Sequence, residues 1–280
     1  MTINILSDLH LDFYFPVNKV PDVNVVKSFF DPIFFDNSKR EIGDVLIIAG
    51  DIGHYNHQNI QILQILQAEY YQHIICVLGN HDYYLVDYKS IDKYHNNAFN
   101  RANEMRELIN EQDHIYCLDG TLIEIEGIRF GGCDSSYSNA YLQKYFPLQD
   151  DDSLINTMWK NEMNDYRMMR NINSYIELYN IEIKKLESIY DKCDVMITHV
   201  NPSYLHKHLP ATYINNKFNT FFTFDGHKFL KNGTMKHWIF GHTHNKLEYD
   251  FHGVKCLCSP LGYPAESNNK EGDFIKSIEI

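Results

Sequence analysis

The stretch CVLGNHDYY, residues 76–84, joins an apolar run to a group of adjacent polar side chains. The run IICVL has the length and composition of a strand that is buried on both of its faces. Gly79 ends this run, and Asn80, His81 and Asp82 follow it directly. In open α/β sheets, ligands bind outside the carboxyl ends of the strands. The stretch therefore predicts a buried strand that delivers an amide, an imidazole and a carboxylate to a functional site.

The same pattern recurs at apolar runs that are far apart along the chain. Each run is followed by side chains of a type that binds metals: Asp8 and His10 after INIL (3–6), Asp51 after VLIIA (45–49), Asn80 after IICVL (74–78), His199 after VMIT (195–198), and His242 and His244 after WIF (238–240). Because ligands sit at the carboxyl ends of such strands, we expect these residues to converge at one place. Gly50, Gly79 and Gly241 each directly precede one of them, and a residue without Cβ lets the chain turn sharply there.

The fold class follows from the alternation of strands and helices. Between the apolar runs, the spacing of apolar side chains predicts helices over 58–72, 90–111 and 174–190. The late pair KLEYD and VKCLC, which flanks residues 251–253, predicts a β-hairpin. The residues alone therefore indicate an α/β domain with buried strands, and a single doubly wound sheet is one form that such a domain takes.

Two segments are less regular than the rest of the chain. Residues 12–42 hold three prolines and many phenylalanines, and we expect them to form a loop over the core. Residues 134–173 are rich in Asp, Asn and Met, and a helix is expected to begin there near Ser153, its N-cap. We interpret this second segment as a surface insertion rather than an independent domain.

The composition limits the classes of function. The 280 residues have room for one large domain or two small ones, and a formal charge of -12 argues against broad, non-specific binding to nucleic acid. The six cysteines form no CxxC pair, so we expect buried free thiols rather than a thioredoxin-like motif or a zinc ribbon. The start MTINILSDLH has no signal-peptide pattern and no run is long enough to span a membrane, so a cytoplasmic protein is expected.

The residues that follow the apolar runs combine carboxylate, imidazole and amide oxygen without a thiolate. Such a set suits Mn, Fe, Zn, Ni or Co better than a structural zinc held by cysteines. The ligands are too many for one catalytic ion with an open position, whereas two ions that share Asp51 as a bridge would use them well. A pair of metals about 3.5–4 Å apart stabilises the attacking and leaving oxygens of an in-line displacement, which suits phosphate esters.

The order of these motifs resembles that of the calcineurin-like metallophosphoesterases. The chain supplies DLH (8–10), GD (50–51), GNHD (79–82), THV (198–200) and GHTH (241–244), in the family's order and over nearly the whole chain. MNDYRMMR (163–170) and SPLGYP (259–264) also resemble stretches of a branch of small bacterial and phage enzymes. The resemblance implies a four-layer αββα sandwich, in which two mixed β-sheets are flanked by helices and a dinuclear metal site lies at the carboxyl ends of the strands. We expect one domain over 1–280, with a surface or lid insertion around 134–190.

Carried over residue by residue, the resemblance implies a role for each motif. Asp8, His10 and His244 would hold the first metal ion, Asn80, His199 and His242 would hold the second, and Asp51 would bridge the two. A water or hydroxide between the ions would attack phosphorus. His81 would face the substrate and either stabilise the pentacoordinate phosphorus or protonate the leaving oxygen, and Asp82 would accept a hydrogen bond from His81. The ions would be divalent or trivalent, with Mn first in vitro and Fe, Zn, Ni, Co or Mg as alternatives.

The same resemblance narrows the substrate. The protein-phosphatase branch reads GDxVDRG and GNHE, whereas this chain has GDIGHYN and GNHD and lacks the arginines of that branch. We therefore expect a phosphodiesterase or phosphatase that acts on a small or nucleotide-like phosphate ester and has no membrane partner. The alternatives are a nuclease that acts on nucleic-acid ends and a non-catalytic scaffold with this fold.

Two further residues are candidate substrate contacts. His54 stands three residues after Asp51, a spacing that also occurs in DNA-repair nucleases of this superfamily, and the alternative is a histidine on the rim without a catalytic role. Arg167 would bind a phosphate through its fork of donors, and the alternative is a solvated residue on a helix.

Overall fold

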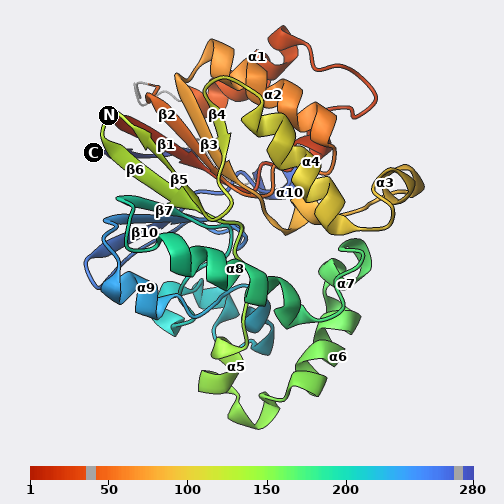
Figure 1. Cartoon of the computed structure of the whole chain (residues 1–280), viewed down its shortest axis with the longest axis vertical. Coiled ribbons are helices and arrows are strands. Elements are labelled where there is room, and N and C mark those ends of the chain that lie inside the picture. Colours follow the sequence, from red (N-terminus) through yellow and green to blue (C-terminus); the bar gives the residue numbers. More distant parts are fainter. Residues whose placement is uncertain (36–41, 268–273) are drawn as a thin grey trace.

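Two stacked β-sheets form the centre of the molecule, and helices cover the outer face of each sheet (Figure 1). The computed structural model describes residues 1–35, 42–267 and 274–280. The layers run helices, sheet, sheet, helices. This order confirms the expected αββα sandwich of two mixed sheets and rules out a single doubly wound sheet.

The first sheet has the strand order β11-β1-β2-β3-β4. Its parallel strands are β1 (Thr2–Leu6), β2 (Val45–Ala49), β3 (His73–Val77) and β4 (Ile115–Cys117). The last strand of the chain, β11 (Lys276–Glu279), pairs antiparallel with β1 at the edge. The carboxyl ends of the parallel strands therefore all lie on one side of the sheet.

The second sheet has the strand order β5-β6-β7-β8-β10-β9. Its strands are β5 (Thr121–Ile125), β6 (Ile128–Gly132), β7 (Val195–Ile197), β8 (His237–Phe240), β9 (Leu247–Phe251) and β10 (Val254–Cys258). The inner strands β6, β7, β8 and β10 run parallel, and hairpins add β5 and β9 antiparallel at the two edges. The hairpin predicted around residues 251–253 is thereby confirmed.

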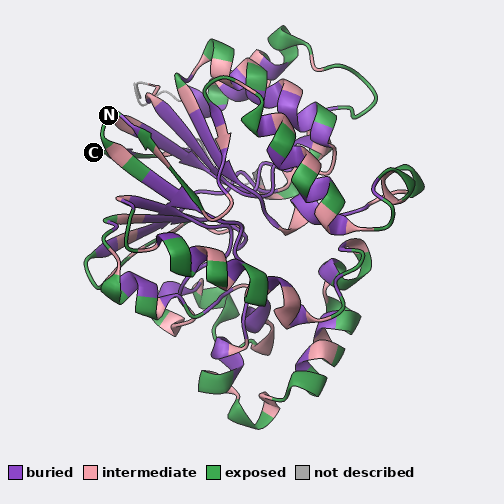
Figure 2. Cartoon of the chain, in the orientation of Figure 1, coloured by how far each residue is buried: buried purple, intermediate pink, exposed green. Residues whose placement is uncertain are grey.

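Alternation along the central strands divides the core into layers. In β2, Val45 and Ile47 pack between the two sheets, whereas Leu46 and Ile48 pack against the helices. Figure 2 shows that the central strands are buried along most of their length. The near-continuous apolar runs of the sequence arise because both faces of these strands are covered.

Helices lie on the outer faces of both sheets. On the first sheet these are α1 (Val23–Phe34), α2 (Asn56–Glu69) and α4 (Ala98–Asn110), and on the second they are α8 (Tyr175–Ile189) and α9 (His227–Asn232) (Figure 1). The other helices are α3 (Tyr88–Lys93), α5 (Ala140–Tyr145), α6 (Asp152–Glu162), α7 (Asn164–Met168) and α10 (Pro264–Ser267). Of these, α3, α6 and α7 lie on the side of the molecule that is remote from the two termini.

The loop expected over residues 12–42 is partly wrong, because α1 lies within it. Asp22 caps this helix, since its carboxylate accepts the backbone N–H groups of Asn24 and Val25. Residues 36–41 lie outside the described part of the chain. The prolines of this segment were therefore a poor guide to its structure.

Two expectations about helix starts are also wrong. The helix expected over 90–111 is divided into α3 and α4, and Asn97 caps the second of them by accepting the N–H of Phe99 at 3.0 Å. The N-cap of α6 is Asp151 rather than Ser153. In each case a side-chain oxygen, that of Asn97 or Asp151, accepts a backbone N–H of the first turn and so sets the start of the helix.

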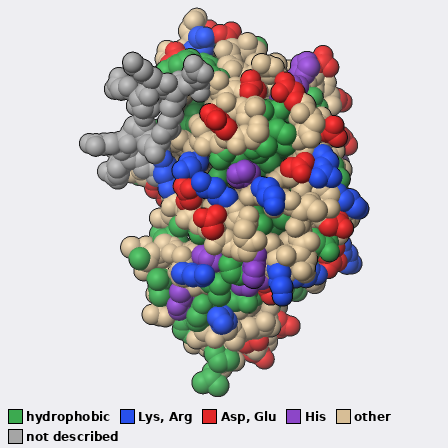
Figure 3. All heavy atoms as spheres, turned by 90° about the vertical axis from the view of Figure 1, so that its left-hand side faces the viewer, with side chains coloured by type: hydrophobic (Ala, Val, Ile, Leu, Met, Phe, Trp, Pro, Cys, Tyr) green, Lys and Arg blue, Asp and Glu red, His purple; other side chains and the backbone are tan. Residues whose placement is uncertain are grey.

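Among the described residues on the face seen in Figure 3, Lys and Arg side chains are interspersed with Asp and Glu. The six cysteines are buried free thiols, as expected. Within the described residues, every helix is too short or too polar to cross a membrane.

Candidate active site and metal centre

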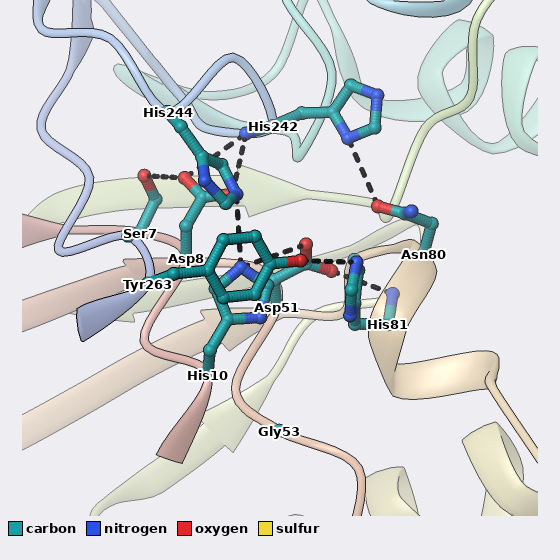
Figure 4. A network of polar contacts seen from close by, with 12 residues as sticks. Ser7, Asp8, His10, Asp51, Gly53, Asn80, His81, His242, His244 and Tyr263 are labelled. Carbon is teal, nitrogen blue, oxygen red and sulfur yellow. Dashed lines mark hydrogen bonds and ion pairs between the residues drawn. The ribbon is translucent and has the colours of Figure 1, made fainter. Parts of the chain in front are cut away.

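The loops that follow the parallel strands bring the predicted residues together (Figure 4). Asp8 and His10 follow β1, Asp51 follows β2, Asn80 follows β3, His199 follows β7, and His242 and His244 follow β8. Their ligand atoms form two groups, one of Asp8, His10, Asp51 and His244 and the other of Asp51, His199 and His242, and within each group the atoms lie within 4.8 Å of one another. The convergence expected from the sequence is thus observed, and both sheets contribute to it.

In the first group, the imidazoles of His10 and His244 point at one another. Their Nε2 atoms lie 3.0 Å apart, and His244 Nε2 lies 3.5 Å from Asp8 Oδ1. The carboxylate of Asp8 also accepts hydrogen bonds from Ser7 Oγ and from the backbone N–H of His242. These bonds fix Asp8, which is completely buried, with an oxygen facing the two imidazoles.

In the second group, Asn80 Oδ1 lies 3.1 Å from His199 Nε2 and 3.0 Å from His242 Nδ1. The far nitrogen of each ring contacts a backbone carbonyl, His199 Nδ1 that of Ala49 at 2.8 Å and His242 Nε2 that of Phe221 at 2.9 Å. A neutral imidazole that donates from one nitrogen carries a lone pair on the other. When both rings are neutral, two lone pairs and an amide oxygen face the same point, and they repel one another unless a metal ion lies between them. These residues fit a metal ion.

Asp51 lies between the two groups and turns one oxygen toward each of them. Its Oδ2 lies 3.8 Å from His10 Nε2, and its Oδ1 lies 3.4 Å from His199 Nε2. The backbone N–H of His81 donates to Oδ1 at 2.8 Å and so fixes the carboxylate. Because Asp51 is buried, its charge requires nearby cations. The arrangement fits two ions that share one carboxylate.

The pKa values of the site reflect this buried negative charge. Burial disfavours the charged form of His199, yet Asp51 and Asp8 raise the pKa of His199 to about 10. Burial also disfavours the charged form of Asp51, but His199 and His81 hold the pKa of that carboxyl well below its usual range. A proton on His199 therefore balances the carboxylates in the protein alone. A metal ion has to displace that proton, so metal binding weakens as the pH falls.

Five of these residues have a left-handed backbone conformation. The angle φ is 52° at Asp8, 44° at His10, 55° at Asp51, 69° at His242 and 51° at His244. Such a conformation is uncommon outside glycine and costs of order 1–3 kcal/mol per residue. The strain lies where loops must aim several side chains at one point, as is typical of functional sites.

His81 is held by a chain of polar contacts that begins at Asp12. His81 Nδ1 lies 2.9 Å from His54 Nε2, and His54 Nδ1 lies 2.8 Å from Asp12 Oδ2. On the other side, His81 Nε2 lies 3.3 Å from the hydroxyl of Tyr263, whose ring stacks on His10 at 4.4 Å. His54, a candidate substrate contact, thus lies behind His81 rather than on the wall of the cavity described below.

The hydrogen bond expected from His81 to Asp82 is wrong. The carboxylate of Asp82 points into the protein, where it accepts the backbone N–H groups of Ile52, Gly53 and Gly79 at 2.8–3.2 Å. Burial raises the pKa of Asp82 to about 6. Asp82 ties the loop after β2 to the loop after β3, so it acts on His81 only through the backbone.

Arg101, on α4, is a buried cation that no sequence motif marks. It is fully buried, and its guanidinium donates to the carbonyl groups of His81 at 2.7 Å, Tyr84 at 3.1 Å and Gly53 at 2.6 Å. Its charge also opposes the effect of burial on the pKa of Asp82. Arg101 therefore holds the same two loops as Asp82, with the opposite charge.

Replacing Arg101 by Leu is expected to lower the free energy of unfolding by about 3–5 kcal/mol. The change leaves the buried carboxylate of Asp82 without a cation and three carbonyl groups without a donor. Urea denaturation at neutral pH measures the loss. The control is Arg129→Leu, which removes a more exposed ion pair with Asp194 (2.9 Å) of a kind that contributes little. Equal losses in the two variants would contradict this role of Arg101.

Asp165, on α7, orients Asn80 from the side opposite the imidazoles. Its Oδ1 accepts from Asn80 Nδ2 at 3.0 Å and from the hydroxyl of Tyr84, and its Oδ2 accepts from the hydroxyl of Tyr137 at 2.7 Å. Because the amide nitrogen of Asn80 is bound here, its Oδ1 has to face the two imidazoles. Asp165 is fully buried, and its partners are distant in the sequence, so no local pattern could reveal its role.

Arg167, a candidate substrate contact from the same stretch as Asp165, lies elsewhere. Its Nη2 donates to the carbonyl of Asn161 at 2.9 Å, and its side chain lines a separate surface cavity beside Arg170. The structure therefore does not bring Arg167 to the metal groups, and the stretch serves the site through Asp165 instead.

A cavity of about 290 Å³ opens over the metal groups. Its walls include Asn80, His81, His244, Tyr263 and, from the end of α6, Glu162. We call it the catalytic cavity. Its volume is at the lower end of the range for ligand pockets.

A third acidic group, Asp119, Asp134 and Glu182, already has cationic partners. Arg106 pairs with both aspartates, and Lys185 pairs with Asp119 at 2.5 Å and with Glu182 at 2.6 Å. These ion pairs offset most of the negative charge, so the group is accounted for without a metal.

Comparisons with known proteins agree with this geometry. A profile of the family described as calcineurin-like phosphoesterase matches residues 1–246. An uncharacterized protein of Acanthamoeba polyphaga mimivirus is 26% identical over 286 residues, which cover 94% of this chain and 92% of that protein.

One of the similar solved structures shows the same fold. Phosphopantetheinyl hydrolase from Mycobacterium tuberculosis superposes with a TM-score of 0.65 at 15% identity, over 99% of this chain and 95% of that chain. A dimetal phosphatase from Danio rerio superposes with a TM-score of 0.45 at 14% identity, over 92% of this chain and 86% of that chain. Because the family profile covers most of the sequence, this chain belongs to the calcineurin-like phosphoesterase family, and it is a hydrolase of phosphoric ester bonds.

Proposed function

We propose that the protein hydrolyses a small or nucleotide-like phosphate ester with two metal ions that share Asp51. The observation that carries this proposal is the convergence of imidazole nitrogens on either side of one buried carboxylate. Asp8, His10 and His244 would hold one ion, and Asn80, His199 and His242 would hold the other. When bound, such ions neutralise the charge of the phosphate and lower the pKa of water.

The donor set supports a choice among metals. It joins carboxylates and imidazoles to one amide oxygen, a mixture that suits Mn, Fe, Zn, Ni or Co better than ions that prefer oxygen ligands alone. We propose Mn as the ion that supports activity in vitro.

We assign His81 to the substrate, because it borders the catalytic cavity and belongs to neither metal group. Asp12 orients His54, and His54 in turn binds His81 Nδ1, so we assign Nε2, which contacts the hydroxyl of Tyr263 at 3.3 Å, to the substrate. Burial holds the pKa of His81 well below its usual range in the protein alone. The negative charge of a bound phosphate would therefore have to favour the protonated form, which would donate to the leaving oxygen. His54 and Asp12 are positioning residues in this proposal, and Asp82 positions the loop.

Hydrolysis of 4-nitrophenyl phosphate and of its diester, bis(4-nitrophenyl) phosphate, tests the proposal. We expect Mn-dependent release of 4-nitrophenol from at least one of them, which a chelator abolishes and added Mn restores. A protein that binds metal at this site but hydrolyses neither ester nor any nucleotide would be a non-catalytic scaffold.

A small ester is favoured over long nucleic acid. The formal charge of -12 and the mixture of Lys and Arg with Asp and Glu among the described residues of the face in Figure 3 argue against non-specific binding to a phosphate backbone. Rates of hydrolysis of phosphomonoesters, cyclic nucleotides and short single-stranded nucleic acids distinguish these two classes of substrate. Preferential cleavage of the single strands would favour the nuclease instead.

Asp165→Asn is expected to lower the affinity for the ion held by Asn80 about 10–100-fold and to spare the other ion. An amide nitrogen would replace one of the oxygens that now accept hydrogen bonds from Asn80 and Tyr137, so Asn80 would lose its fixed orientation. Calorimetric titration with Mn measures both affinities. Asp152→Asn is the control, because it alters a similar contact, to the hydroxyl of Tyr175 at 2.7 Å, by a carboxylate that belongs to neither metal group. Unchanged affinities in Asp165→Asn would contradict the proposal.

A further inference from the structure

A second cavity adjoins the catalytic cavity. We call it the side pocket; its volume is about 260 Å³, and its walls include Leu209, Pro210, Tyr213, Phe218 and Phe222. Tyr213, Phe222 and Thr243 line both cavities, so the two spaces share a wall.

Phe222 stands between the side pocket and the metal groups. Its ring centroid lies 5.0 Å from that of His242, at an interplanar angle of 34°. The preceding carbonyl, that of Phe221, contacts His242 Nε2 at 2.9 Å. The segment that orients a proposed metal ligand thus also builds the near wall of the side pocket, and the pocket begins one ring away from that ligand.

Two polar side chains of the side pocket form hydrogen bonds with backbone groups of other residues in its walls. Asn219 Nδ2 donates to the carbonyl of Tyr213 at 2.5 Å, and Asn216 Oδ1 accepts the N–H of Phe218 at 3.0 Å. The surface that remains for a ligand is mainly apolar and aromatic. Tyr213 is 45% exposed, which leaves a large aromatic side chain open beside the active site.

We propose that the side pocket binds a flat aromatic ring, an aryl group or a nucleobase, on the organic part of the phosphate ester. The inference rests on the proposed function, which places the phosphate over the metal groups. Three aromatic residues in its walls, Tyr213, Phe218 and Phe222, can offer the stacked and edge-to-face contacts that an aromatic ligand uses. An engineered apolar cavity of about 150 Å³ in another protein binds benzene, so the side pocket has room for a larger ring.

Binding of phosphonates, which resist hydrolysis, tests the inference without any need for turnover. Calorimetry on the Mn-loaded protein compares methylphosphonate, hexylphosphonate and 1-naphthylmethylphosphonate. We expect the naphthyl compound to bind at least about tenfold more tightly than methylphosphonate, and the hexyl compound to gain less. Equal affinities for the naphthyl and methyl compounds, or an equal gain for the hexyl compound, would overturn the aromatic subsite.

Substitutions of Phe218 test whether the tighter binding of the naphthyl compound arises in the side pocket. In Phe218→Ala, the ratio of naphthyl to methyl affinity is expected to fall toward one, and Phe218→Leu, which is easier for the fold to accept, is expected to lower it in part. The control is Tyr88→Ala, which removes a 90% exposed aromatic ring on α3 and keeps the ratio. If both Phe218 variants keep the same ratio of naphthyl to methyl affinity as the unmodified protein, the assignment to the side pocket is overturned.

The result also separates this inference from the proposed function. If methylphosphonate binds but the naphthyl ring adds nothing, the side pocket is not a subsite and the phosphate site stands. If no phosphonate binds, the proposed phosphate site fails, and the subsite fails with it.

Discussion

Asp51→Asn is expected to release both metal ions together and to lower kcat/KM by ~10³-fold or more, since each metal contributes several kcal/mol of transition-state charge stabilisation. The substitution keeps the shape of the side chain but removes the charge that lies between the two groups. Each carboxylate oxygen faces an imidazole of a different group, Oδ2 that of His10 at 3.8 Å and Oδ1 that of His199 at 3.4 Å. In the variant, the second group therefore loses its carboxylate, and the first group keeps only that of Asp8.

Mass spectrometry of bound metals, together with steady-state kinetics, measures both effects. Asp194→Asn is the control, because it makes the same chemical change at the ion pair with Arg129, which lies outside both metal groups. Loss of one ion with full retention of the other would show that Asp51 is not shared.

His81→Ala is expected to keep both ions but to lower turnover by about 10²–10⁴-fold, the usual contribution of a general acid. His81 borders the catalytic cavity but lies outside both metal groups. The loss should be larger for an alkyl ester than for a 4-nitrophenyl ester, because a poor leaving group depends more on a proton donor.

The control for His81 is His57→Ala, which removes an exposed imidazole from α2. Metal content and the dependence of the rate on the leaving group are compared in the two variants. If His81→Ala loses metal, His81 is a ligand. If the loss of turnover is the same for all leaving groups, His81 supplies charge rather than a proton.

The sequence predicted the convergence of the site because that convergence depends on local patterns. A buried apolar run predicts a strand, and the polar residues directly after it must lie at the strand end, as Asp8, Asp51 and Asn80 do. Parallel strands place these ends on one side of a sheet. The short strands β5 and β11 and the helix α1 were missed, because the first two are half exposed and the third follows two prolines.

The residues that hold the ligands in place could not be predicted in this way. Asp165 reaches Asn80 across 85 positions, and Asp12 reaches His54 across 42. No periodicity connects such pairs, which meet only because the fold brings their loops together. Asp82 shows the opposite error. It neighbours His81 in the sequence, but its side chain turns inward to backbone N–H groups, so adjacency was mistaken for contact.

Anomalous diffraction from crystals of the Mn-loaded protein tests the shared metal centre most directly. We predict two Mn peaks on opposite sides of the Asp51 carboxylate. One peak should lie among Asp8, His10 and His244, and the other among Asn80, His199 and His242. A single peak, or two peaks of which only one contacts Asp51, would contradict a pair of ions bridged by this residue.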